Sequence, residues 1–124
     1  MTQDNVEYFT EKEEEFINLL IEIGTKRNVA RMLFFLSSTK KATSRAIELG
    51  TGMHQPEVSM AMKYLVERGW IKNSVSPSDS KGRPMKVYEL AKTITVIMDC
   101  IEKEKENEEN NKLALVRKLR DYIR

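Results

Sequence analysis

The sequence has a single cysteine, Cys100, and a single histidine, His54. One cysteine cannot form an intrachain disulfide, and one Cys and one His far apart in the sequence are a poor basis for a metal site. No apolar run is long enough to cross a bilayer, and the first ten residues lack the basic start and apolar core of a signal peptide. We therefore expect no cofactor or metal, no membrane partner and a cytoplasmic location.

Catalytic patterns are also missing from the sequence. It contains no pair of carboxylates at a spacing typical of acid–base catalysis, no nucleophile with an accompanying base, and no glycine-rich loop that would cradle a phosphate. These absences argue against an enzyme.

The positive charge is concentrated in the middle of the chain. The 124 residues carry a net charge of only +2, but residues 1–25 carry −6, residues 26–90 carry +7 and residues 91–124 carry +1. A chain of this length forms one domain with room for an appendage. A localised basic segment is what binding to phosphates requires, so residues 26–90 are the candidate binding module.

Two helices are expected before residue 40. Thr10 precedes Glu13 by the three residues of a capping box, which predicts a helix that starts there and ends near Gly24. Val29, Leu33 and Leu36 form the apolar stripe of a second helix, from about residue 26 to residue 37.

The next segment predicts two short helices joined by a tight turn. Thr43 or Ser44 can cap the first helix, which ends near Gly50, and Gly52 lies in the turn, where a permissive backbone is needed. The second runs from about residue 55 to residue 68, and Val58 and Met62 lie on its inner face. The 3.6-residue period then places a polar set on its outer face: Gln55, Pro56, Ser59, Met60 and Lys63.

A β-hairpin is expected to follow. Its first strand begins at Trp70 and Ile71, its loop spans residues 76–84, and its second strand spans residues 86–90. The loop is rich in Pro, Ser and Gly, and its tip carries Lys81, Gly82 and Arg83. This is the pattern of a winged helix-turn-helix, in which the second helix enters the major groove of DNA.

The C-terminal segment is helical again, with apolar ends and a charged middle. In a heptad reading with Met98 at position a, the charged seam positions are Lys105, Glu108 and Lys112. We interpret the segment as two helices, about 92–106 and 111–123, joined by a break near residues 107–111. The alternative is one long helix whose middle lies in solvent.

The stretch TSRAIELGTGMHQPEVSMAMKYLVERGWI resembles the helix-turn-helix of winged-helix regulators grouped around MarR, ArsR and TrmB, and KGRPMKVYEL is similar to their wing. The resemblance covers about residues 26–90, and the short, Met-rich chain suggests a small archaeal member. It implies a homodimer bound to a pseudo-palindromic operator in double-stranded DNA. The chain lacks the cysteine pairs of metal-sensing ArsR members and the sugar-binding domain of full-length TrmB proteins.

The expected fold is therefore mainly α with a small β-hairpin wing (α+β), a winged helix-turn-helix with additional N- and C-terminal helices. Residues 1–25 form a supporting or dimerising helix, residues 26–91 bind DNA, and residues 92–124 dimerise. The recognition helix is about 55–68, and the wing, about 76–84, lies on the DNA backbone or in the minor groove. The predicted DNA-binding residues are Lys40, Lys41, Thr43, Ser44, Arg45, His54, Gln55, Pro56, Ser59, Met60, Lys63, Lys81, Gly82 and Arg83.

Several features have a second interpretation. Glu57 either accepts a hydrogen bond from a cytosine amine or, as we favour, complements the dipole of its helix. Cys100 is a weak candidate for a redox sensor, because its neighbours Asp99 and Glu102 are acidic and disfavour a thiolate. The alternative function is a winged-helix protein-interaction module of the transcription machinery, without sequence-specific DNA binding. The sequence leaves open whether any small-molecule effector is sensed.

Overall fold

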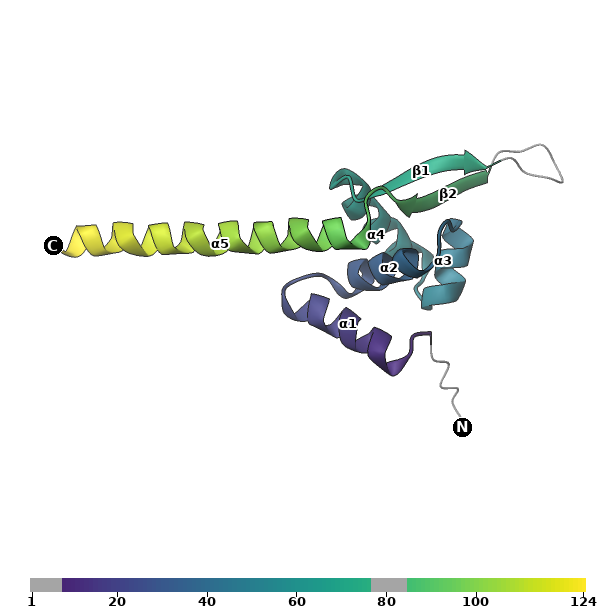
Figure 1. Cartoon of the computed structure of the whole chain (residues 1–124), viewed down its shortest axis with the longest axis horizontal. Helices are drawn as coiled ribbons and strands as arrows, with labels where there is room; N and C mark the ends of the chain where they lie inside the picture. The colour runs from purple at the N-terminus through teal and green to yellow at the C-terminus, as the bar shows by residue number, and fades with distance from the viewer. Residues whose placement is uncertain (1–7, 77–84) are drawn as a thin grey trace. The chain divides into compact units, whose positions relative to one another are not determined.

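The computed structural model of the chain describes residues 8–76 and 85–124. Within them, the chain forms five helices and one antiparallel hairpin (Figure 1), which confirms the predicted fold class, mainly α with a small β-hairpin. The elements in chain order are α1 (Glu11–Glu22), α2 (Arg27–Ser38), α3 (Ser44–Thr51), α4 (Gln55–Glu67), β1 (Ile71–Ser76), β2 (Met85–Leu90) and α5 (Ile94–Ile123). They divide into two compact units, Met1–Ala91 and Lys92–Arg124.

The start of α1 confirms the predicted capping box. The backbone N–H of Thr10 donates to Glu13 Oε1 at 2.8 Å, and the N–H of Glu13 donates to Thr10 Oγ1 at 3.2 Å. These two bonds satisfy amides that the first turn of a helix leaves without a partner. The helix ends at Glu22, and the following Gly24 has a φ of 110°, which agrees with its expected role as a stop.

The core of the first unit lies around α2, which packs against α1, α3 and α4 (Figure 1). Its buried side chains come from positions that the helical periods predict. Leu33 of α2, Ile47 of α3 and Leu65 of α4 have no exposed surface, and Val58 has 1%. Burying side chains of this size contributes about 1.5–3 kcal/mol each, and this burial holds the two helices of the helix-turn-helix in place.

The hairpin pairs Ile71 with Leu90 and Ser76 with Met85 at its two ends. A third segment, which the sequence analysis did not predict, joins its edge, since Ala42 forms an antiparallel bridge with Tyr88. Trp70 is buried, 5% exposed, as expected for a residue that packs the hairpin against the helices. Residues 77–84, which contain most of the expected loop, lie outside the described residues.

The C-terminal segment forms one helix, α5, and our interpretation of two helices with a break near residues 107–111 was wrong. The segment contains no Gly or Pro that would stop a helix. Its charged middle also carries stabilising pairs at helical spacing. Lys105 Nζ lies 3.3 Å from Glu108 Oε1, and Lys112 Nζ lies 3.8 Å from Glu109 Oε2. The alternative of one long helix with an exposed middle is correct.

Candidate nucleic-acid interface

A left-handed residue and a buried hydroxyl build the turn between α3 and α4. Gly52 caps α3 with a φ of 75°, as the sequence predicts. The Thr51 side chain is fully buried, donates to the carbonyl of Ile47 at 2.6 Å and accepts from the N–H of Met53 at 3.2 Å. Thr51 thus satisfies backbone groups on both sides of the turn, which the sequence analysis missed because nothing in the sequence marks this threonine as buried.

Small residues allow the helices of the first unit to approach one another closely. A Cβ added to Gly50 would collide with the ring of Phe35 in α2. Ala61 of α4 has no exposed surface. Small residues at these two positions are what a close helix crossing requires, and the crossing determines which face of α4 points outward.

The outer face of α4 is the predicted one. The inward-facing residues Val58, Ala61, Met62 and Leu65 are buried, and Met60 on the opposite side is 64% exposed. Gln55 Nε2 donates to Ser59 Oγ at 2.9 Å, so these two side chains form a local polar pair on the surface. The five residues predicted for this face are exposed, and so is the predicted DNA-binding residue His54 at the N-cap of α4; together they are His54, Gln55, Pro56, Ser59, Met60 and Lys63. We call these six residues the recognition face.

A hollow separates the recognition face from the hairpin. Gln55, Ser59 and Lys63 line one side of it, and Asn73 and Tyr88 line the other. Asn73 and Tyr88 are partners in the strand register, which places them next to each other on the two strands. The sequence analysis did not include them, because only the fold brings these strand positions beside α4. Their amide and phenol groups add hydrogen-bonding capacity to the surface.

The residues before and at the start of α3 divide into two groups. Lys40, Lys41 and Arg45 are exposed, as contact with a DNA backbone requires. Thr43 and Ser44 are half-buried, and Thr43 Oγ1 accepts the N–H of Ala46 at 3.0 Å as the cap of α3. Thr43 therefore caps α3, which confirms one of the two caps that the sequence allows.

Glu57 takes part in the cap of α4, which agrees with the role at the helix N-terminus that we favoured for it. Its Oε1 accepts the backbone N–H of His54 at 2.9 Å, which caps the first turn of α4. The backbone carbonyl of Glu57 also accepts from Asn28 Nδ2 at 3.3 Å, which ties α4 to the start of α2. Since the carboxylate is engaged with the backbone at the start of its own helix, the cap accounts for the presence of an acid in this first turn.

The predicted wing residues Lys81, Gly82 and Arg83 lie outside the described residues. Among residues 8–76 and 85–124, no group of three or more His, Cys, Asp or Glu side chains is placed to hold a metal ion. No helix in the same part of the chain is long and apolar enough to span a membrane.

Comparison with known proteins adds to this geometry. Residues 23–82 match the model of the MarR family. This segment contains α2, α3, α4 and β1, so the match covers the helix-turn-helix itself. The predicted resemblance to winged-helix regulators of this group is confirmed, and the fold matches that of MarR-like winged-helix regulators. None of the curated proteins matches the sequence.

Solved structures share the MarR-like fold at low sequence identity. A "possible transcriptional regulator" from Methanosarcina mazei Go1 is 12% identical, with a TM-score of 0.61 over 79% of this chain and 81% of that one. A MarR family transcriptional regulator from Silicibacter pomeroyi DSS is 17% identical, with a TM-score of 0.55 over 81% of this chain and 64% of that one. TrmBL2, an archaeal chromatin protein, is 19% identical, with a TM-score of 0.53 over 83% of this chain and 39% of that one.

The chain spans 55% of the length of another matching transcriptional regulator and 64% of the Silicibacter protein, so parts of these relatives have no counterpart in it. The family match supports the prediction that the chain is not an enzyme.

Proposed function

We propose that the protein is a sequence-specific regulator of transcription that binds double-stranded DNA as a homodimer. In this proposal α4 lies in the major groove, and the wing lies on the backbone or in the minor groove. The observation that carries it is the recognition face: six exposed residues at the N-cap and on the outer side of the second helix of a helix-turn-helix, with Glu57 beside them engaged in a helix cap. Its surroundings in residues 26–90 carry a net charge of +7.

The chemistry of the recognition face suits base edges. Gln55 can pair with adenine, Ser59 can bond to either kind of base edge, and Met60 can pack against the methyl group of thymine. Lys63, which is exposed beside them, is placed to neutralise a phosphate. Lys40, Lys41 and Arg45 add exposed positive charge at the start of the supporting helix.

The test is duplex binding by a double variant, Lys63→Ala with Arg83→Ala. We expect the wild-type protein to shift genomic duplexes in a salt-dependent manner and the variant to lose most of this affinity, because two phosphate contacts per subunit are removed. A matched control, Lys12→Ala with Lys103→Ala, removes the same charge from α1 and α5 and should retain binding. Unchanged affinity in the Lys63/Arg83 variant would contradict the proposal.

A second candidate function is a protein-interaction module of the transcription machinery. It is favoured by exposed apolar side chains on α4, since Met60, Tyr64 and Val66 are 64%, 43% and 38% exposed. A gel shift with random genomic duplex separates the two functions, because an interaction module without DNA binding would leave every duplex unshifted. The charge of +7 on residues 26–90 favours DNA.

A further inference from the structure

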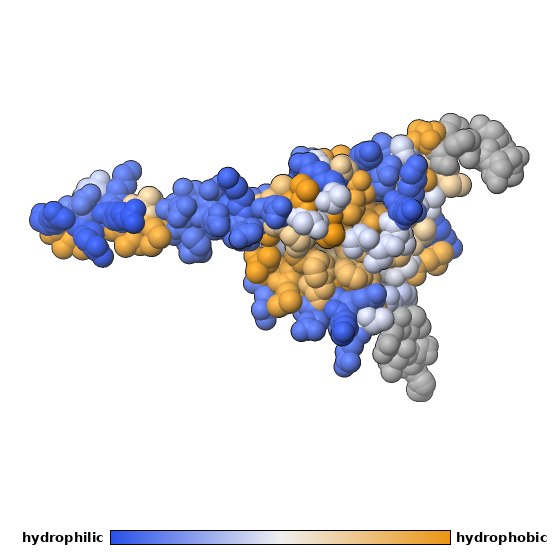
Figure 2. Space-filling view, in the orientation of Figure 1, coloured by the Kyte–Doolittle hydropathy of each residue, from blue (hydrophilic) through white to orange (hydrophobic). Residues whose placement is uncertain are grey.

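The C-terminal end of α5 presents an apolar stripe to solvent. Leu115, Leu119 and Tyr122 recur at spacings of four and three residues and are 60%, 64% and 87% exposed. Figure 2 shows hydrophobic side chains along this end of α5, beyond a hydrophilic stretch in the middle of the helix. A helix with an exposed stripe of this kind gains stability when a second helix covers it.

Towards the N-terminus of α5, the same stripe continues through three charged residues. Lys112, Glu108 and Lys105 occupy the seam positions that a coiled coil usually fills with apolar side chains. In a parallel pair of α5 helices in register, each of these residues would meet its own copy, so that three layers of like charge would face each other. That arrangement is unfavourable.

An antiparallel pair removes this conflict. When two α5 helices run in opposite directions about Asn110, Glu108 of each copy lies opposite the partner's Lys112, so that two pairs of opposite charge fill the centre. Lys105 then lies opposite the partner's Leu115, which the aliphatic part of the lysine side chain can cover. The apolar ends also meet, because Met98 lies opposite the partner's Tyr122. Ile101 is already buried in the single chain, so the half-buried Met98 supplies the accessible apolar surface there.

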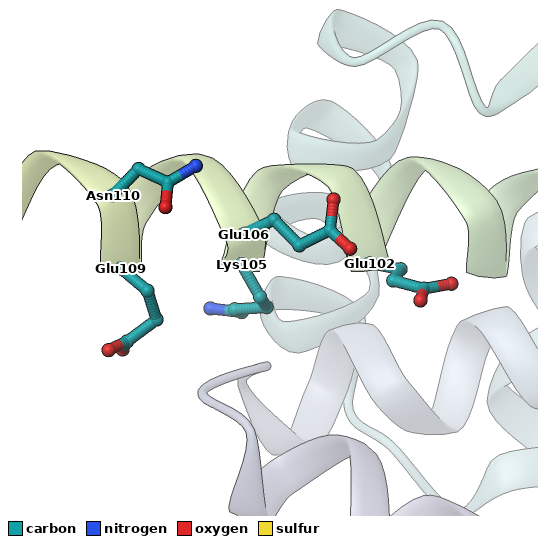
Figure 3. A pocket seen from close by; sticks show the side chains of 5 residues that line it. All are labelled: Glu102, Lys105, Glu106, Glu109 and Asn110. Carbon is teal, nitrogen blue, oxygen red and sulfur yellow. The ribbon is translucent and has the colours of Figure 1, made fainter.

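The charge along α5 agrees with the antiparallel arrangement. Residues 94–109 carry six acidic and two basic side chains, whereas residues 110–124 carry five basic and one acidic. Figure 3 shows part of the acidic half, where a hollow on α5 is lined by Glu102, Lys105, Glu106, Glu109 and Asn110. An antiparallel partner brings its basic half beside these carboxylates. The helix dipole alone does not account for the pattern, since its effect is confined to the first and last turns and the acids extend to the middle of the helix.

We propose that two copies of the chain pair through α5 in antiparallel orientation, with the pairing centred near Asn110. The inference rests on the homodimer of the proposed function and specifies the surface, orientation and register of its interface. The partner is a second copy of this chain, because the acidic and basic halves of α5 complement each other when the same sequence is reversed against itself.

Charge reversal tests the orientation. In the antiparallel pair, residue 108 of each copy faces residue 112 of the other. Glu108→Lys or Lys112→Glu alone therefore places like charges at both of these contacts, and we expect the dissociation constant of the dimer to rise about tenfold. The double variant, Glu108→Lys with Lys112→Glu, restores opposite charges and should return the constant to within about threefold of wild type. Sedimentation equilibrium measures these constants, and circular dichroism verifies that each variant retains its helix. In a parallel pair, each position faces the same position of the other copy, so like charges face each other both in the wild type and in a single variant. Single variants whose dissociation constant equals that of the wild type would therefore overturn the inference.

Cys100, the only cysteine, provides an independent measurement. A rise of 1.5 Å per residue places two spin labels on Cys100 about 30 Å apart along an antiparallel pair centred at residue 110. In a parallel pair they lie side by side, under about 20 Å apart. A dimer with the short distance would overturn the orientation and leave the proposed homodimer intact. A monomer at micromolar concentration would overturn both, while duplex binding is tested separately by the gel shift.

Discussion

The backbone of Ala42 exchanges two hydrogen bonds with the backbone of Tyr88. The N–H of Ala42 donates to the carbonyl of Tyr88 at 3.0 Å, and the N–H of Tyr88 donates to the carbonyl of Ala42 at 2.8 Å. Ala42 lies two residues before α3, so this bridge ties the start of the helix-turn-helix to the hairpin. It thereby holds Tyr88 and its strand partner Asn73 at the hollow beside the recognition face.

We predict that Ala42→Pro lowers stability by about 2 kcal/mol or more. Proline removes the N–H of residue 42 and leaves the carbonyl of Tyr88 without this donor. Thermal unfolding followed by circular dichroism should show a midpoint several degrees lower. Ala42→Gly is the matched control, because it keeps both backbone hydrogen bonds and removes only a methyl group. Equal destabilisation by both variants would show that the bridge contributes nothing.

Gly52 and Gly69 both have a left-handed backbone, so replacing each of them with Ala compares the loss of unfolding free energy at two similar positions. Their φ values are 75° and 76°, but a Cβ on Gly52 would lie 2.6 Å from the Tyr8 ring, whereas a Cβ on Gly69 would meet no atom within 4 Å. We expect Gly69→Ala to cost about 1 kcal/mol of unfolding free energy, and Gly52→Ala to cost more.

The additional cost at Gly52 should disappear when Tyr8 is also replaced by Ala. Urea unfolding measures the free energy of unfolding of each variant. The cost of Gly52→Ala without the Tyr8 ring is the difference between the Gly52/Tyr8 double variant and Tyr8→Ala alone. Equal costs at Gly52 and Gly69 with Tyr8 present would contradict the expectation that the ring must move.

We predict that Glu57→Ala lowers stability by about 0.5–1 kcal/mol and does not weaken DNA binding. The loss of stability follows from the removed cap on the N–H of His54. Affinity for duplex DNA should rise or stay equal, because a negative charge next to the recognition face is removed. If Glu57 instead reads a cytosine, the variant should lose selectivity among sites selected from genomic DNA, which would contradict the structural role.

Gln55 and Lys63 should differ in how they affect binding. Gln55→Ala removes a side chain suited to a base edge. We expect the variant to lose about 1–3 kcal/mol of binding free energy on the preferred DNA site and to be less selective at one base pair of that site. Lys63→Ala removes a phosphate contact, so it should weaken all sequences similarly and reduce the slope of log affinity against log salt by about one. Titrations of a selected site and a random duplex at several salt concentrations separate these outcomes.

The sequence by itself determined the local elements and which face of each helix is buried. Helical period, capping residues and turn glycines are local signals, and they predicted the Thr10 capping box, the Gly52 turn and the outward position of Met60. They are reliable because a buried stripe at 3.6-residue spacing admits only one inward face. The division of α5 into two helices failed for the opposite reason. Charged seam positions indicate that a helix is exposed, and exposure alone does not break it.

Only the tertiary structure decided which distant residues meet. The bridge between Ala42 and Tyr88 joins segments 46 positions apart, and no periodic signal marks a bridge formed by a single residue pair. The positions of Asn73 and Tyr88 beside α4, and the burial of Thr51 in the turn, depend on how the hairpin and helices pack. Long-range packing thus places the strand residues at the interface, whereas the recognition face follows from the geometry of one helix.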